Sequence, residues 1–472
     1  MIDRTVDDMR RRYPYLHIEF FHSGACSSPV ADIIRYIYNL YHEPHVLFIT
    51  HAALELLPMG FKRENWHLII DEIPMVTKAF EKNLSANHGL ITPYLVTNRP
   101  DGEYYRVAAK DNKSLTGLAD NPDGDAVIEI FEELAYTVLS DHWTSFTPAA
   151  GYDALVSGTG SGRKLTVLSL LQPSLVQGFK GVTIAGASFT DSLLYKYWAK
   201  HGVRFVELSE LKLKYDRHEN GSELDIYYFI DQHWSKSLAR KKEGEILKAM
   251  EKNILNEVGT SKFLFAQNKG CHLFKNVETR FALPNAPHGL NTYQHYLNVV
   301  YLSARNLIPA HGKFLERMMG IKWDDIHTAI QHQVAYQTIM RGALRDQDNH
   351  EPKRVFVPDK ATAEWLQMLF PGSRVTKLEI GIDEETICGR RGRPKIYNSD
   401  AARKRASRRK QKIDELDNLS KLLMFEENDP TIFRLRESAC ASIQNVSHDI
   451  PIKTNSIFAT YFRGSVFSAR EV

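Results

Sequence analysis

Two adjacent carboxylates, Asp71 and Glu72, stand where a short apolar run ends, in WHLIIDEIP at residues 66–74. Such a run indicates a buried strand, and functional groups of parallel sheets lie just past the carboxyl ends of their strands. A carboxylate pair in this place suits nucleotide hydrolysis, because Asp71 can hold Mg²⁺ through water while Glu72 orients and deprotonates the attacking water. The alternative is a solvated turn after a buried strand.

A second set of candidate residues lies in YQTIMRGALRD, at residues 336–346. Gln337, Arg341 and Arg345 recur every four residues, so on one helix they would share a face. Arginine binds phosphate oxygens with paired hydrogen bonds, which makes these residues candidates for arginine fingers from a second domain. A helix with a basic, solvated stripe is the alternative.

The elements that must position these residues alternate between strands and helices. Apolar runs that indicate strands include HVLFITHAALE, GVTIAGASFTDS, VRFVEL, DIYYFI, KFLFAQNKG and NVVYLSA. Strands that alternate with helices predict an α/β fold with parallel sheets. We expect a first domain at residues 1–195 with a loop-rich insertion at about 76–165, a second at 196–375, and a C-terminal segment at 376–472.

Composition narrows the class of protein. The 472 residues are 43% hydrophobic and 25% charged, as in globular proteins, and no apolar run reaches the 18 residues of a membrane span. The N-terminus is charged from its third residue and has no secretory signal pattern, so we expect a cytoplasmic protein without a membrane partner. The four cysteines are far apart and form no Cys-x-x-Cys pair, which disfavours a zinc site or a disulfide framework.

The positive charge is concentrated near the C-terminus. Residues 389–412, GRRGRPKIYNSDAARKRASRRKQK, hold eleven Lys and Arg and one Asp, whereas the other residues carry 49 Lys and Arg against 56 Asp and Glu. This distribution predicts a polyanionic partner for a basic tail that is mostly helical or disordered. A disordered, solvated charge run is the alternative.

One stretch of the tail resembles an AT-hook core, whose arginines enter a narrow, A·T-rich minor groove of DNA. Its residues are Arg391, Gly392, Arg393, Pro394 and Lys395. Farther on, an apolar stripe of about three turns, too short for a sustained heptad seam, favours docking onto the body over dimerisation.

The motifs also occur in an order that resembles the superfamily 2 helicases of the DEAD/DEAH-like, phage and plasmid type, over roughly residues 1–350. FITHAAL (48–54) is similar to the Thr-His element that contacts DNA, and LIIDEIP (68–74) is similar to the Walker B box. AGASFTDS (185–192) resembles the Ser-Ala-Thr motif, and FLFAQNKG (263–270) resembles the first strand motif of the second RecA-like domain.

Two further motifs complete the resemblance. HGLNTYQHYLNVVYLSA (288–304) resembles the glycine-containing motif that contacts nucleic acid and nucleotide, and QTIMRGALR (337–345) resembles the last motif, whose Gln and Arg sense ATP. The resemblance therefore implies two RecA-like domains with ATP and Mg²⁺ between them. On one side stand Asp71 and Glu72, and on the other Gln337, Arg341 and Arg345.

The resemblance also implies partners. DNA, with RNA as the alternative, would lie near Thr50, His51 and Gly289. The family suggests replication or recombination proteins as further partners, in a bacterium or a phage-infected host cell.

The sequence departs from the family at the phosphate-binding loop. No Gly-x-x-x-x-Gly-Lys-Ser/Thr occurs before Thr50, and GTGSGRK (158–164) has the wrong glycine spacing and follows Asp71. We therefore expect the first RecA-like domain to be incomplete. The main alternative function is a non-catalytic DNA-binding or scaffold protein derived from a helicase. A nuclease is disfavoured, because the 19 histidines show no metal-binding spacing.

Overall fold

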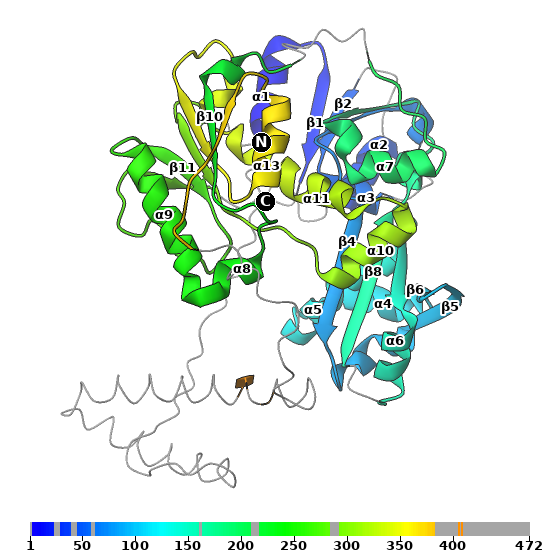
Figure 1. Ribbon diagram of the computed structural model, residues 1–472. Coiled ribbons are helices and arrows are strands. Elements are labelled where there is room, and N and C mark those ends of the chain that lie inside the picture. Colours follow the sequence, from blue (N-terminus) through cyan, green and yellow to red (C-terminus); the bar gives the residue numbers. More distant parts are fainter. Residues whose placement is uncertain are drawn as a thin grey trace, which may run out of the picture. The chain divides into compact units, whose positions relative to one another are not determined.

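The computed structural model describes residues 2–22, 29–38, 45–57, 62–159, 163–208, 217–283 and 292–382, together with Arg405, Ser407 and Arg408. The chain divides into two compact units, Met1–Gly389 and Arg390–Val472. Figure 1 draws the elements of the first unit as ribbons. The three described residues of the second unit are helical, and the AT-hook-like residues lie outside the described residues.

Two short parallel strand pairs form the first part of the chain. The strand β1 pairs with β2, and β3 pairs with β9. The bounds are α1 Ile2–Arg12, β1 His17–Phe21, α2 Pro29–Tyr38, β2 His45–Ile49, α3 His51–Leu56, β3 His67–Asp71, β9 Gly181–Ala185 and α7 Leu193–Lys200.

The strand β3 is buried on one face only, which corrects the expectation of a fully buried strand. Ile70 is buried, whereas Ile69 is 74% exposed. The reason is that β3 has a single partner strand in a two-stranded sheet, so nothing among the described elements covers the face of His67, Ile69 and Asp71.

An antiparallel sheet follows β3 in the sequence, in the order β4-β8-β7-β6-β5. Its bounds are β4 Thr77–Asn83, β5 Leu95–Asp101, β6 Tyr104–Ala109, α4 Asn112–Asp120, α5 Ala126–Leu139, β7 Trp143–Pro148, α6 Ala149–Val156 and β8 Lys164–Leu171. The helix α5 begins at Asp125, whose side chain accepts a hydrogen bond from the backbone N–H of Val127. It covers the sheet with a buried stripe that includes Phe131 and Leu134.

A six-stranded, all-parallel sheet forms the second part, in the order β12-β11-β13-β14-β10-β15. The strand bounds are β10 Leu224–Tyr228, β11 Phe263–Ala266, β12 Arg280–Ala282, β13 Asn298–Tyr301, β14 Lys353–Phe356 and β15 Arg374–Lys377. The helix bounds are α8 Lys236–Arg240, α9 Glu245–Val258, α10 Pro309–Met319, α11 Trp323–His327, the π-helical turn η8 Thr328–His332, α12 Gln333–Ile339 and α13 Lys360–Leu369.

The predicted fold class, α/β with parallel sheets, is confirmed. The runs FLFA and NVVY are buried at every position, as expected for inner strands covered on both faces. One strand prediction was wrong: VRFVEL, at 203–208, forms no strand, and Val206 is 75% exposed.

Arg63 connects the parallel and antiparallel parts. Its side chain is 2% exposed and donates hydrogen bonds to the backbone carbonyls of Ser174, Leu175, Gln177 and Leu57 at 3.1–3.4 Å. It also lies 3.3 Å from Nε2 of His142 and over the ring of Phe179. Burial lowers the pKa of both Arg63 and His142, and the nearby guanidinium further favours a neutral imidazole.

Two buried histidines make the fold sensitive to acid. Burial lowers the pKa of His311, whose Nε2 lies 2.6 Å from Oγ1 of Thr77, to about 4. Burial, followed by the neighbouring His327, lowers the pKa of His332 to about 4. In the unfolded chain both would titrate near their ordinary pKa of 6.5.

Stability is therefore expected to fall as the pH drops from 6.5 towards 4, because only the unfolded chain takes up these two protons in that interval. Going from pH 7 to pH 5 should cost about 2 kcal/mol of unfolding free energy for each histidine. Urea denaturation at a series of pH values measures this loss. A His311→Gln/His332→Gln variant should lose most of the dependence, and an unchanged slope in that variant would contradict the assignment.

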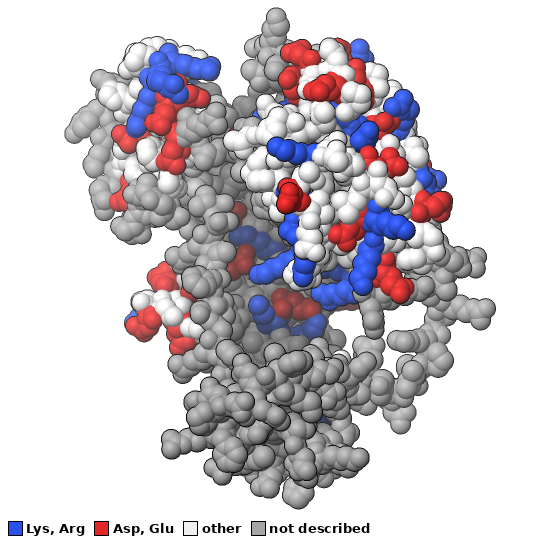
Figure 2. Space-filling view, turned by 90° about the vertical axis from the view of Figure 1, so that its left-hand side faces the viewer, with Lys and Arg blue, Asp and Glu red and all other residues white. Residues whose placement is uncertain are grey.

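The described surface carries both signs of charge. Figure 2 shows the side of the molecule that lies on the left in Figure 1. On this face, Lys and Arg side chains lie among Asp and Glu side chains. Within the described residues, no helix has the length and apolar character needed to cross a membrane.

Candidate functional site

The predicted carboxylates lie at the carboxyl ends of β3 and β9. Asp71 is the last residue of β3 and pairs with Ala185, the last residue of β9. Its side chain is exposed, and none of the described residues pairs with its carboxylate. Glu72 follows in the left-handed region with a φ of 69°, a conformation that costs a non-glycine residue free energy and often marks functional sites.

The loops after β3 and β9 lie against each other. A Cβ at Gly186 would lie 2.3 Å from Cγ1 of Ile73, far too close for a real contact. Only glycine therefore lets the AGAS loop approach Ile73 of the DEIP loop this closely.

The Thr-His element is joined to the same strand end. Nε2 of His51 lies 3.0 Å from the backbone oxygen of Asp71 and can donate a hydrogen bond to it. Oγ1 of Thr50 accepts a hydrogen bond from the backbone N–H of Ala53 at 3.1 Å and so caps α3. His51 thus holds α3 against β3 and Thr50 caps the start of α3, whereas DNA contact by either residue stays a prediction.

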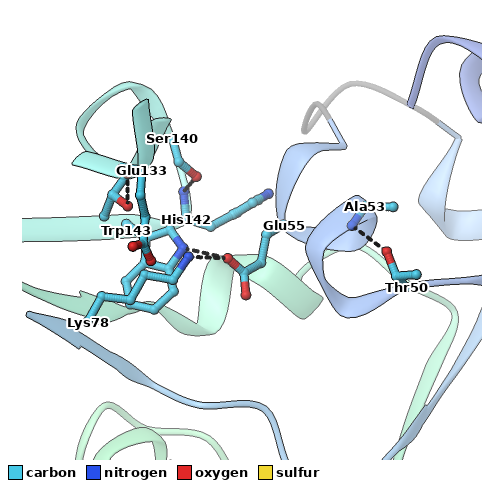
Figure 3. A network of polar contacts seen from close by, with 9 residues as sticks. Thr50, Ala53, Glu55, Lys78, Glu133, Ser140, His142 and Trp143 are labelled. Atoms are coloured by element: carbon cyan, nitrogen blue, oxygen red, sulfur yellow. Dashed lines mark hydrogen bonds and ion pairs between the residues drawn. The ribbon is translucent and has the colours of Figure 1, made fainter. Parts of the chain in front are cut away.

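The other end of α3 is attached to the antiparallel sheet, as Figure 3 shows. The carboxylate of Glu55 accepts hydrogen bonds from Nε1 of Trp143 at 3.1 Å and from Nζ of Lys78 at 3.0 Å. The ammonium of Lys78 also lies 4.5 Å from the centre of the Trp143 ring, a cation–π contact. The helix α3 therefore bridges the carboxylate loop and β4.

The predicted arginines do not lie on one helix, which corrects the sequence-based argument for them. The helix α12 ends at Ile339, Arg341 follows its C-terminus, and Arg345 belongs to a separate 3-10 turn, η9 Ala343–Arg345. The break has a tertiary cause. Gly342 packs so closely that an added Cβ would lie 2.8 Å from the backbone oxygen of Tyr296, which accepts a hydrogen bond from the N–H of Ala343.

The charge of Glu72 nevertheless acts on Arg341. The side chain of Arg341 is 6% exposed, and burial followed by the charge of Arg345 lowers its pKa, while the carboxylate of Glu72 raises it. An arginine remains protonated under these conditions, so the carboxylate of Glu72 favours the buried positive charge that follows α12. Gln337 lies 3.4 Å from a guanidinium nitrogen of Arg341, one turn earlier.

A contact between the two parts involves Gln333, which the sequence argument missed. Its Nε2 donates a hydrogen bond to the backbone oxygen of Ser188, at 3.1 Å, in the loop after β9. The four-residue spacing that singled out Gln337 and Arg341 continues one turn earlier in the sequence, to Gln333. This spacing was the sequence signal that could have identified Gln333.

A second missed residue, Gln331, holds the loop after β13. Its amide donates to the backbone oxygen of Ser303 at 2.9 Å and accepts from the N–H of Arg305 at 2.8 Å. Asn268, after β11, fastens the same loop through two hydrogen bonds to Ala304 at 2.7 and 3.0 Å. The carboxyl edge of a parallel sheet is where ligands of open α/β folds bind, so these residues give that edge a defined shape.

The remaining predicted positions are placed as follows. Gly289 lies outside the described residues, as do Arg391, Gly392, Arg393, Pro394 and Lys395. Lys164, in the glycine-rich GTGSGRK, begins the strand β8 and forms an ion pair with Glu81. Because a phosphate loop leads into a helix rather than an antiparallel strand, this placement agrees with the sequence argument against it.

Across the described ranges, no three or more His, Cys, Asp or Glu side chains are arranged to hold a metal ion. Two cavities of about 710 and 270 Å³ border α5, and neither is lined by Asp71, Glu72 or Arg341.

Comparison with known proteins finds no matching family model and no matching curated protein. A solved structure named "XPD_APO" is similar to the chain at 10% sequence identity and a TM-score of 0.41. The likeness covers 76% of this chain and 86% of that one.

Proposed function

We propose that the chain is a DNA-dependent ATPase of the helicase type, whose nucleotide site lies between Asp71 and Glu72 on one side and Arg341 and Arg345 on the other. The observation that carries this proposal is the hydrogen bond of 3.1 Å from Gln333 to the backbone oxygen of Ser188, which joins the helix before Arg341 to the loop beside the end of β3. Two residue types needed for phosphoryl transfer, a water-activating carboxylate and a phosphate-binding arginine, follow β3 and α12 respectively, and the charge of the carboxylate acts on the arginine.

The residues present suit a hydrated Mg²⁺ more than a caged metal. Mg²⁺ usually keeps several waters and takes one or two carboxylates plus substrate phosphates, and the exposed carboxylate of Asp71 meets that requirement. When bound, MgATP supplies the phosphoryl group. Glu72 would orient a water and accept its proton, while Arg341 and Arg345 would face the charge of the phosphates.

DNA is the proposed nucleic-acid partner, with RNA as the alternative. Thr50, His51 and Gly289 would lie along it, and the basic residues 389–412 would hold its phosphates. Replication or recombination proteins are the proposed further partners.

The test is DNA-stimulated ATP hydrolysis by the purified full chain with and without Glu72→Gln. Glutamine keeps the size of the side chain and removes the proton acceptor, so turnover is expected to fall by about 10²–10⁴-fold. Nucleotide binding, measured with a fluorescent ATP analogue, should persist in the variant. Turnover that survives in Glu72→Gln would show that the hydrolysis belongs to a contaminant and would refute the assignment.

A non-catalytic DNA-binding protein is the second candidate function. One observation favours it: the sequence holds no phosphate-loop motif. Under this candidate, the wild-type chain would bind DNA and show neither ATP turnover nor binding of the fluorescent analogue.

A further inference from the structure

The larger cavity is a groove of about 710 Å³ between the helix α5 and the strand β4. Six residues of α5 form one wall of the groove. The other five follow the first by 3, 4, 7, 8 and 11 residues, so all six lie on a single face of the helix. They are Ala126, Glu129, Ile130, Glu133, Leu134 and Thr137. Phe80 and Val167 line the sheet side, and Ile308 and His311 also border the groove.

The wall of this groove is acidic. Residues 120–141 contain seven Asp and Glu and no Lys or Arg. Glu129 and Glu133 are exposed, lie one helical turn apart, and pair with no basic side chain of the described residues. Lys78 and Lys82 of β4 line the opposite side of the groove, and Lys78 pairs with Glu55.

The same helix exposes apolar side chains. Val127, Ile130 and Tyr136 are 46%, 40% and 39% exposed, although the opposite face of α5 packs on the sheet. Apolar exposure beside unpaired charge is typical of protein interaction sites. A nucleic acid does not fit this wall, since its phosphates would meet unpaired carboxylates.

We propose that the groove binds a basic amphipathic helix of a partner protein. Leu- or Ile-type side chains of that helix would contact Ile130 and Phe80, and Lys or Arg one turn apart would pair with Glu129 and Glu133. The proposal is independent of ATP hydrolysis, because Asp71, Glu72 and Arg341 do not line the groove.

The experiment uses the full chain and a labelled helical peptide of about 18 residues with a Leu stripe flanked by Lys. The control peptide has Glu in place of each Lys. Fluorescence anisotropy should detect the Lys peptide with an affinity that falls at high salt, and not the Glu peptide.

Glu129→Lys/Glu133→Lys should weaken the peptide affinity by at least about tenfold, because like charges then face each other. Lysine is a good helix former, so α5 should persist, which circular dichroism checks. Ile130→Ser should also weaken binding, whereas Glu103→Lys/Glu364→Lys, at exposed sites outside the groove, should not.

Three results would overturn the proposal. Equal affinity for the wild type and the Glu129→Lys/Glu133→Lys variant would place the peptide elsewhere. Complete displacement by low concentrations of spermidine would identify a small polycation as the ligand. A dimer in sedimentation that dissociates in the same variant would mean that a second copy of this chain covers the groove.

Discussion

Arg341→Ala is expected to lower DNA-stimulated ATP hydrolysis by about 10³-fold or more, the range found for arginines that stabilise transferring phosphoryl groups. The expectation follows from the position of Arg341 behind the C-terminus of α12, the helix that Gln333 joins to the loop after β9. Steady-state kinetics should show the loss in kcat more than in KM, because the interaction strengthens as charge develops.

Two matched variants make this result interpretable. Arg341→Lys keeps the charge and loses the planar fork, so it should recover only part of the activity. Arg217→Ala removes an arginine that is 81% exposed and should leave turnover unchanged. Equal activity in Arg341→Ala and the wild type, with intact thermal melting, would exclude Arg341 from the reaction.

Arg63→Met is expected to destabilise the fold by about 3–5 kcal/mol, as measured by urea denaturation. Methionine retains much of the apolar stem but leaves four backbone carbonyls without their donor. Those carbonyls are partly or fully buried, so water replaces the guanidinium only at a cost.

Arg374→Ala provides the control for Arg63. Arg374 makes two hydrogen bonds to Asp225, at 2.6 and 3.0 Å, yet its side chain is 73% exposed. Exposed pairs contribute little because water screens them, so the removal of Arg374 should lower the unfolding free energy far less than Arg63→Met does. Similar losses of unfolding free energy in the two variants would show that burial does not account for the contribution of Arg63 to stability.

The sequence predicted the inner strands β10, β11 and β13 of the second sheet and missed the inner strand β14 and both edges. Inner strands are covered on both faces, so β11 and β13 appear as continuous apolar runs. The edge strands β12 and β15, RFA and RVTK, are partly exposed and short, and they leave no comparable pattern.

The candidate site was predictable in its residue types and not in its geometry. The position of the carboxylates at the end of β3 could be predicted from the apolar pattern of that one strand. The end of α12 could not be predicted in this way, because it depends on the contact of Gly342 with a carbonyl more than forty residues earlier in the chain. Whether Arg341 approaches Glu72 likewise depends on the packing of two sheets, which no local pattern encodes.

The attachments of α3 have a mechanical consequence. A six-residue helix is too short to bend, so its two ends must move together. One end is bonded to the backbone of Asp71 and the other, through Glu55, to Lys78 and Trp143. A load applied to the antiparallel sheet would therefore reach the tip of β3 as a displacement of its last peptide group, and a rearrangement at that tip would pull on the sheet in return.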